Sequence, residues 1–181
     1  MIADSVRLAL PGEAEQIAAL QRRGWGQQLP QAVAGPMLAA IDLEGMTDSW
    51  RRAIQRPPLA TFRVLVALDA ERLTGFAVTG PSGDADASPE EDGLVAEFVI
   101  DPPAQRRGHG SRLLHAVVDT LRADGFRRAT WWVRSSDDAL LGFLSEAGWA
   151  ADGAHTEVGT EDGALRVKLI RLHTDIAAAP R

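Results

Sequence analysis

Two arginines and two glycines lie together in the segment QRRGHG, Gln105–Gly110, directly before a stretch with helical spacing. Glycines let a ligand approach the backbone closely, and the first N–H groups of a helix have no partner within that helix. Together with the positive end of the helix dipole, such groups bind phosphate oxygens. The alternative is a basic, solvated turn between a strand and a helix. The segment by itself leaves both interpretations open.

The spacing of the glycines excludes two other phosphate-binding motifs. The run GHGSRL lacks the third glycine of a dinucleotide-binding fingerprint, and the chain has no Gly-Lys-Ser/Thr end of a nucleotide triphosphate loop.

One acid, Glu97, interrupts the apolar segment LVAEFVI, Leu94–Ile100, which precedes the loop. A carboxylate on such a strand is usually functional or paired, because an isolated buried charge is unfavourable. Glu97 is therefore a candidate general base or substrate contact. The alternative is a side chain that faces the sheet surface beside an arginine. His109 and His115 are predicted to face solvent.

The composition excludes several classes of mechanism. The chain has no cysteine, so it has no disulfide, thiolate metal site or cysteine nucleophile. Its four histidines are scattered without metal-ligand spacing, and no metal is expected. The net charge of −6 disfavours a nucleic-acid binder, and no apolar run approaches the length of a membrane span. The first residues do not resemble a signal peptide, so a cytoplasmic location is the default expectation.

Periodicity predicts the elements that must hold these residues. Strands are expected over residues 5–10, 62–69, 74–80, 94–100, 129–133 and 164–172, with a further extended segment from Trp149. Helices are expected over residues 13–25, 47–55, 111–124 and 137–148, and an irregular or weakly helical segment over 26–46. The acidic segment 81–93 indicates a solvated or mobile loop, and an alternative role for it is to attract a cationic acceptor. Two strand–helix–strand crossovers imply some parallel pairing in a mixed sheet, within a single domain of residues 1–181.

With these elements around it, the QRRGHG loop resembles the Q/R-x-x-G-x-G/A loop of the GNAT superfamily of N-acetyltransferases. The preceding FVIDP is similar to that family's strand-then-proline signature, and DDALLGFLSEAGW, residues 137–149, resembles its N-x-x-A-x-x-F-Y-x-x-x-G-F helix. The run AEFVIDP…RRGHG also resembles one half of mycothiol synthase, which is itself built of GNAT domains.

The resemblance covers nearly the whole chain and implies the GNAT fold. That fold is of the α/β (α+β) class, with a mixed, mostly antiparallel, twisted sheet of six to seven strands flanked by about four helices. Residues 1–60 would then form a variable region on the acceptor side. Residues 94–149 would form the cofactor-binding core, and residues 174–181 a tail.

The resemblance also implies acetyl-CoA as cosubstrate. Backbone groups of Phe98, Val99 and Ile100 would pair with the pantetheine arm like an added strand. The pyrophosphate would be held by the loop and the start of the helix, which comprise Gln105, Arg106, Arg107, Gly108, His109, Gly110 and Ser111. Asp137 stands where the family often has an Asn that touches the pantetheine, and Phe143 would pack near the far end of the cofactor. An ionised Asp only accepts hydrogen bonds, whereas an Asn also donates them.

The acid–base half of the site departs from the family. The usual general acid is a Tyr directly after the Phe of the last helix, but that position is Leu144 and the chain has no tyrosine. Other members carry a Glu that acts as the general base at one of two strand positions. These positions correspond to Trp132 and to the neighbourhood of Leu94. Glu97 is therefore the candidate base, and His155, near the acceptor end by analogy, is a weaker candidate.

Two hypotheses follow for the function. The first is an N-acetyltransferase that moves an acetyl group from acetyl-CoA directly to an amine, without a covalent intermediate. The second is a non-catalytic module that binds acyl-CoA, which the missing Tyr favours. The expected partner is a small-molecule or peptide amine, with no nucleic acid and no membrane. The identity of the amine and the formation of a homodimer stay open.

Overall fold

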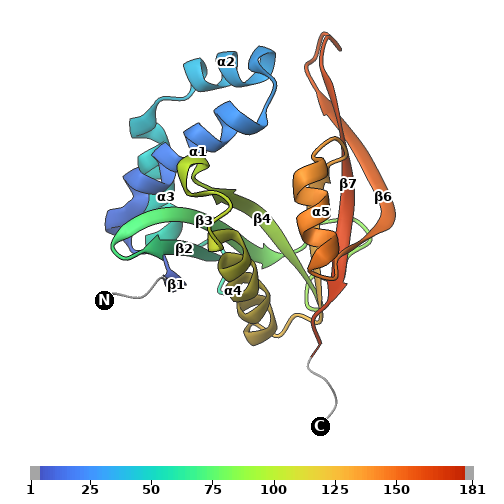
Figure 1. The fold of residues 1–181 in the computed structure, drawn as a ribbon. Helices are drawn as coiled ribbons and strands as arrows, with labels where there is room; N and C mark the ends of the chain where they lie inside the picture. Colours follow the sequence, from blue (N-terminus) through green and yellow to red (C-terminus); the bar gives the residue numbers. More distant parts are fainter. Residues whose placement is uncertain (1–4, 178–181) are drawn as a thin grey trace. The chain divides into compact units, whose positions relative to one another are not determined.

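The computed structural model describes residues 5–177, which form seven strands and five α-helices (Figure 1). Two short 3-10 turns, Pro11–Glu13 and Pro102–Ala104, precede α1 and α4. In chain order the elements are β1 (Ser5–Leu8), α1 (Ala14–Gln28), α2 (Gln31–Ala40), α3 (Leu43–Gln55), β2 (Arg63–Asp69), β3 (Arg72–Pro81), β4 (Asp92–Ile100), α4 (His109–Ala123), β5 (Arg128–Arg134), α5 (Asp138–Glu146), β6 (Ala150–Gly159) and β7 (Arg166–Asp175).

The strands form one mixed sheet in the order β1-β2-β3-β4-β5-β7-β6. Strand β4 is parallel to β5, whereas β1–β2, β2–β3, β5–β7 and β6–β7 are antiparallel pairs. The predicted mixed, mostly antiparallel sheet is therefore confirmed. Residues 5–177 contain five α-helices, where the resemblance implied about four.

The chain divides into two compact units. The first comprises the residues up to Gly80 together with Glu97–Thr120, and the second comprises Pro81–Ala96 and the residues from Leu121 onward. Strand β4 and helix α4 each contribute residues to both units.

In the first unit, α1 and α3 pack side by side (Figure 1). Helix α1 carries an apolar stripe that includes Ile17 and Leu20, and both side chains are buried in a core with Val66, Phe76 and Val99. The core residues of α1 lie at helical spacing, and those of β2 and β3 include alternate positions such as Val64 and Val66, or Phe76 and Val78. This is the pattern expected where a helix covers one face of a sheet.

The N-terminal helices differ from the sequence prediction. The segment 26–46, expected to be irregular or weakly helical, contains all of α2, and α3 begins at Leu43 rather than at residue 47. The cause at α3 is a local cap, because Asp42 Oδ1 accepts a hydrogen bond from Gly45 N at 2.6 Å. Gly35 and Pro36 have low helix propensity and therefore weaken the helical pattern of the α2 sequence, although both lie inside the helix.

In the second unit, β6 and β7 form a long hairpin with α5 beside β7 (Figure 1). Trp131 of β5 packs edge-to-face on Trp149, with 5.9 Å between the ring centroids, and Leu144 of α5 is fully buried. Strand β7 continues to Asp175 and Ile176 is buried, so the tail predicted from residue 174 begins later. Residues 178–181 lie outside the described part of the chain.

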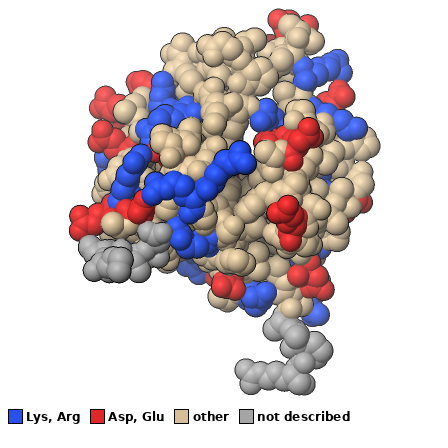
Figure 2. Space-filling view, in the orientation of Figure 1, with Lys and Arg blue, Asp and Glu red and all other residues tan. Residues whose placement is uncertain are grey.

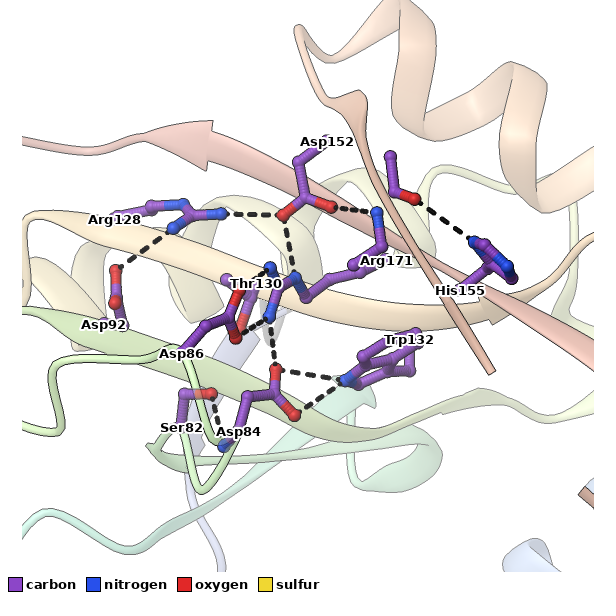
Figure 3. A network of polar contacts seen from close by, with 12 residues as sticks. Ser82, Asp84, Asp86, Asp92, Arg128, Thr130, Trp132, Asp152, His155 and Arg171 are labelled. Atoms are coloured by element: carbon purple, nitrogen blue, oxygen red, sulfur yellow. Dashed lines mark hydrogen bonds and ion pairs between the residues drawn. The ribbon is translucent and has the colours of Figure 1, made fainter. Parts of the chain in front are cut away.

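The acidic segment 81–93 is anchored, in contrast to the solvated loop expected from its composition (Figure 3). The buried Arg171 of β7 bonds to Asp84 at 3.0 Å and Asp86 at 2.6 Å in this segment, and to Asp152 of β6 at 2.7 Å. The indole N–H of Trp132 also donates to Asp84. The hydrogen bond from Arg171 lowers the pKa of Asp86 to about 2. The guanidinium of Arg171 in the sheet therefore fixes the 81–93 segment in place. The composition of the segment could not indicate this contact.

Candidate active site

Strand β4 carries Glu97 and the three residues expected to pair with a pantetheine arm, Phe98–Ile100. It runs antiparallel to β3, because Asp101 N donates to Thr74 O and Ser82 N donates to Asp92 O. Its parallel register with β5 covers Asp92–Leu94, within the second unit, and no described pair in that register lies beyond Leu94.

Two glycines of the first unit fix the end of β4 by close packing. A Cβ atom on Gly24 of α1 would lie 2.6 Å from Val99 Cγ1. A Cβ atom on Gly75 of β3 would lie 2.6 Å from Ile100 Cδ1 and 2.8 Å from Val99 O. Real side chains do not tolerate such distances, so the absence of a side chain at both positions sets where Val99 and Ile100 lie.

The carboxylate of Glu97 belongs to a polar chain inside the first unit. The amide Nε2 of Gln21 in α1 donates to Glu97 Oε1 at 3.3 Å, and the indole N–H of Trp50 in α3 donates to Gln21 Oε1 at 2.9 Å. Burial raises the pKa of Glu97 above that of an ordinary Glu, and the hydrogen bond from Gln21 opposes that rise in part. Glu97 is half-buried and has Gln21 rather than an arginine as its partner.

The segment after β4 is held by the buried Asp101. Its two carboxylate oxygens accept from Arg23 of α1 at 2.9 and 3.2 Å, and Arg72 of β3 lies 3.5 Å away. Its backbone carbonyl accepts from Ala104 N and closes the turn that contains Pro102. An acid in the strand-then-proline signature thus positions the loop that follows.

The loop itself has a constrained backbone. Gly108 has φ of +85°, a conformation that suits glycine, and a Cβ atom there would meet nothing within 4 Å. Arg106 has φ of +61°, which is uncommon for a residue with a side chain. The side chain of Gln105 donates to Ile100 O at 3.2 Å and to Gln27 Oε1 at 3.0 Å, so it ties the loop to the end of β4 and to α1.

The basic and imidazole groups of the loop have different environments. Arg106 and Arg107 are exposed, and Figure 2 shows basic side chains gathered over the region of this loop and the start of α4. Arg107 lies 3.3 Å from Asp69 at the end of β2. His109 is 2 % exposed and its Nδ1 lies 2.7 Å from an Arg112 nitrogen, so the prediction that it faces solvent is wrong. His109 begins α4 and its ring turns inward with the apolar face of the helix.

The two remaining predicted cofactor residues lie in the second unit. Asp137 caps α5, because its Oδ1 accepts from Leu140 N at 3.1 Å, and it also lies 3.4 Å from Arg134. Phe143 is half-buried on α5, and the next residue, Leu144, belongs to the core. His155 is exposed in β6. The first unit therefore brings together Glu97, Phe98–Ile100 and Gln105–Ser111, whereas Asp137 and Phe143 belong to the other unit.

The model of the acetyltransferase (GNAT) family matches residues 35–149, which is more than half of the chain. The chain belongs to the GNAT acetyltransferase family. The matched residues include β4, the QRRGHG loop, α4 and α5, which are the elements that carry the predicted cofactor residues.

Sequence relatives of this GNAT chain include two mycothiol acetyltransferases. The protein of Rhodococcus erythropolis is 31% identical over 127 residues, and that of Kineococcus radiotolerans is 38% identical over 120 residues. These matches cover 66% and 65% of this chain but only 38% and 37% of the relatives. The chain thus spans little more than a third of the curated relatives that it matches.

The fold is similar to that of a Salmonella typhimurium protein, described as an acetyltransferase, whose structure contains acetyl-CoA. The TM-score is 0.74 at 16% identity, over 99% of this chain and 98% of the other. Within residues 5–177, no helix has the length and apolarity required to cross a bilayer, and no cluster of three or more acidic or histidine side chains is arranged to hold a metal ion.

Gln21 and Asp101 contact the candidate site or the segment that leads to it, and the sequence prediction assigned no role to either. Gln21 has a signal in the sequence, because it lies between Ile17 and Gly24 on the buried stripe of α1, where a polar residue needs a partner. Asp101 is part of the quoted FVIDP signature, but its pairing with Arg23 and Arg72 depends on tertiary contacts that no local pattern reveals.

Proposed function

We propose that this GNAT chain is an acetyl-CoA-dependent N-acetyltransferase in which Glu97 acts as the general base. The observation that carries the proposal is the half-buried carboxylate of Glu97, on the strand that leads into the glycine-containing loop. The family match, the mycothiol acetyltransferase relatives and the fold shared with an acetyl-CoA-bound protein support it.

The cofactor half of the site fits acetyl-CoA. The N–H groups at the start of α4 and the dipole of that helix favour the pyrophosphate, and the left-handed turn at Gly108 leaves open space beside them. Arg106 is exposed at the same loop and complements phosphate charge. The backbone of Phe98–Ile100 offers hydrogen-bonding groups to the pantetheine arm, and Asp137 and Phe143 are further candidate contacts.

Acetyl-CoA supplies an activated acetyl group, which passes to the amine nitrogen as the C–S bond breaks and the thiolate leaves. The acceptor arrives mostly as ammonium, and neutralising an alkyl amine of pKa near 10.4 at pH 7 costs about 4–5 kcal/mol. Glu97 would accept that proton, and burial raises its pKa in the direction that makes it a stronger base near neutral pH. A thiol of pKa about 8.5 leaves readily as an anion, so a general acid matters less than the base.

One observation favours the alternative of a non-catalytic acyl-CoA-binding module. The position of the family's Tyr acid is Leu144, which is fully buried in the core and has no proton to donate. Such a module would bind acetyl-CoA without turning it over.

The discriminating experiment is release of free CoA from acetyl-CoA in the presence of a panel of small amines, amino acids and peptides. We expect turnover with at least one acceptor, and a loss of about 10²–10⁴-fold in kcat for Glu97→Gln. Glu71→Gln, which removes an exposed acid in the turn between β2 and β3, is the matched control and should retain full activity. Unchanged turnover in Glu97→Gln would overturn the role of Glu97, and binding without any turnover would favour the module.

A further inference from the structure

Gln21 is a buried polar residue that no part of the cofactor site requires. Its side chain is only 6 % exposed, on the face of α1 where apolar residues otherwise pack. Both ends of its amide have partners in the first unit, Trp50 on one side and Glu97 on the other. A buried glutamine with two such partners is oriented rather than merely tolerated.

The orientation of the amide follows from the chemistry of Trp50. An indole N–H only donates, so it bonds to the amide oxygen, Gln21 Oε1, at 2.9 Å. The amide NH₂ must then point the other way, and it donates to Glu97 Oε1 at 3.3 Å. A flipped amide would place two donors against each other at Trp50 and an oxygen against a carboxylate oxygen at Glu97.

The indole is in turn held by aromatic packing. Trp50 contacts the buried Phe76 of β3 edge-to-face, with 5.3 Å between the ring centroids and 75° between the rings. The orientation of Gln21 therefore depends on α3 and β3 as well as on α1.

From this geometry we propose that Gln21 is the positioning residue for the general base: oriented by Trp50, it fixes the Glu97 carboxylate and favours its ionised form. The inference rests on the proposed function, because it assigns a role to Glu97 in catalysis. A hydrogen bond from a donor stabilises the ionised form of a carboxylate. The Gln21 donor therefore counteracts burial, which disfavours the ionised form of Glu97.

Several charged groups elsewhere in the unit have partners other than Glu97. Asp101 binds Arg23 and Arg72, and Asp69 lies against Arg107 and His109. Arg22 of α1 donates to the carbonyls of Leu38 and Ile41. Burial and the hydrogen bond from Gln21 are the two influences on the ionisation of Glu97 that the structure identifies.

The test compares wild type, Gln21→Met and Trp50→Phe by two measurements. Gln21→Met keeps an unbranched side chain of similar size but removes the donor, and Trp50→Phe keeps an aromatic ring but removes the indole N–H. The pKa of the Glu97 carboxyl is measured directly by NMR titration of ¹³C-labelled Glu. The acidic limb of the kcat/KM profile is measured with an acceptor found in the amine panel.

We expect Gln21→Met to raise the pKa of Glu97 by about one unit, which is the effect of losing one hydrogen bond to a charged group. The acidic limb of the kcat/KM profile should shift to higher pH by the same amount, and kcat should recover at higher pH. Trp50→Phe should raise the pKa of Glu97 and shift the acidic limb in the same direction, but by a smaller amount than Gln21→Met. The reason is that the Gln21 amide keeps its donor but loses its fixed orientation. Gln16→Met, at an exposed position of the same helix, is the matched control and should move neither.

The outcomes separate this inference from the proposed function. An unchanged pKa of Glu97 in a folded Gln21→Met variant overturns the inference and leaves the proposed function intact. A raised pKa with an unmoved acidic limb also overturns it, because Gln21 would then act on a carboxyl that does not control the rate. Full turnover in Glu97→Gln removes the proposed base, and the positioning role is lost with it.

Discussion

The carboxyl group of Glu97 gives up its proton less readily in the folded chain than in the unfolded chain, because burial disfavours the charged form and raises its pKa. Between the unfolded pKa of about 4.3 and the higher folded pKa, the native state binds more protons than the unfolded state. The contribution of Glu97 to stability therefore falls as the pH rises through this window.

Glu97→Gln should consequently stabilise the fold at neutral and alkaline pH while it removes the proposed base. The amide oxygen of the variant side chain still accepts from Gln21, but no buried charge remains. The gain in melting temperature over wild type should be larger at about pH 8 than at about pH 5. Thermal unfolding followed by circular dichroism at both pH values checks this, and a variant less stable than wild type at both would contradict the account.

The sequence made Glu97 a candidate base because an acid inside an apolar strand is conspicuous, and this role stays a prediction. It did not identify Gln21, although a glutamine on the buried stripe of α1 carries the same kind of signal. His109 was assigned to solvent because it lies between two glycines, yet the start of α4 turns its ring inward. Local composition could not predict this, because the direction of a side chain depends on where the helix begins.

Among the elements, the end of β4 is sensitive to what packs on it. Gly75→Ala would place a methyl group 2.8 Å from Val99 O and 2.6 Å from Ile100 Cδ1. We expect a loss of about 1–3 kcal/mol in the free energy of unfolding, as for overpacking in a core, together with weaker acetyl-CoA binding. Gly12→Ala, where a Cβ atom meets nothing within 4 Å, is the matched control. Equal stability of the two variants in denaturant titrations would contradict the packing argument.

In the second unit, the buried guanidinium of Arg171 forms ion pairs with three acids, Asp84, Asp86 and Asp152. Arg171→Leu should lower the free energy of unfolding by about 3–5 kcal/mol, since Asp84 and Asp152 lose the buried guanidinium and keep only Trp132 and Arg128, respectively, as partners. Arg166→Leu, which removes the exposed pair with Glu157 at the start of the same strand, should cost only about 0–1 kcal/mol. Denaturant titration measures both, and similar losses would show that burial at Arg171 adds nothing.

Element prediction succeeded where the pattern was strong and local. The stripe of α4, the apolar β4 and the glycine at the end of α5 gave the strand–helix order from residue 92 to 148 to within a few residues. Helix α2 lies in a segment that was expected to be irregular or weakly helical, because Gly35 and Pro36 weaken its intrinsic helix preference. The anchoring of the 81–93 loop was missed because its partner, Arg171, lies about eighty residues further along the chain.

Across the whole molecule, the family follows from elements distributed over most of the chain, whereas the acid–base chemistry depends on a few side chains. The two compact units share β4 and α4, and the predicted cofactor residues are divided between them. The prediction of a single domain over residues 1–181 stays a prediction. So does the assignment of residues 1–60 to the acceptor side, although Gln21 and Trp50 place two residues of that region in the chain of contacts to Glu97.

Binding of acetyl-CoA underlies every step of the proposed chemistry, and the loop at Gly108 is its most specific requirement. Gly108→Ala places a side chain at φ of +85°, which costs roughly 1–2 kcal/mol and redirects the loop N–H groups. The matched control is Gly83→Ala in the 81–93 loop, where a Cβ atom also meets nothing within 4 Å but φ lies outside the left-handed region.

Isothermal titration calorimetry with acetyl-CoA is the most direct test of this account. Wild type and Gly83→Ala should show saturable binding with a dissociation constant between about 1 µM and 1 mM, as is typical for an enzyme and its substrate, and Gly108→Ala should bind about tenfold more weakly. Absence of binding to the wild-type chain at millimolar acetyl-CoA would contradict the central claim.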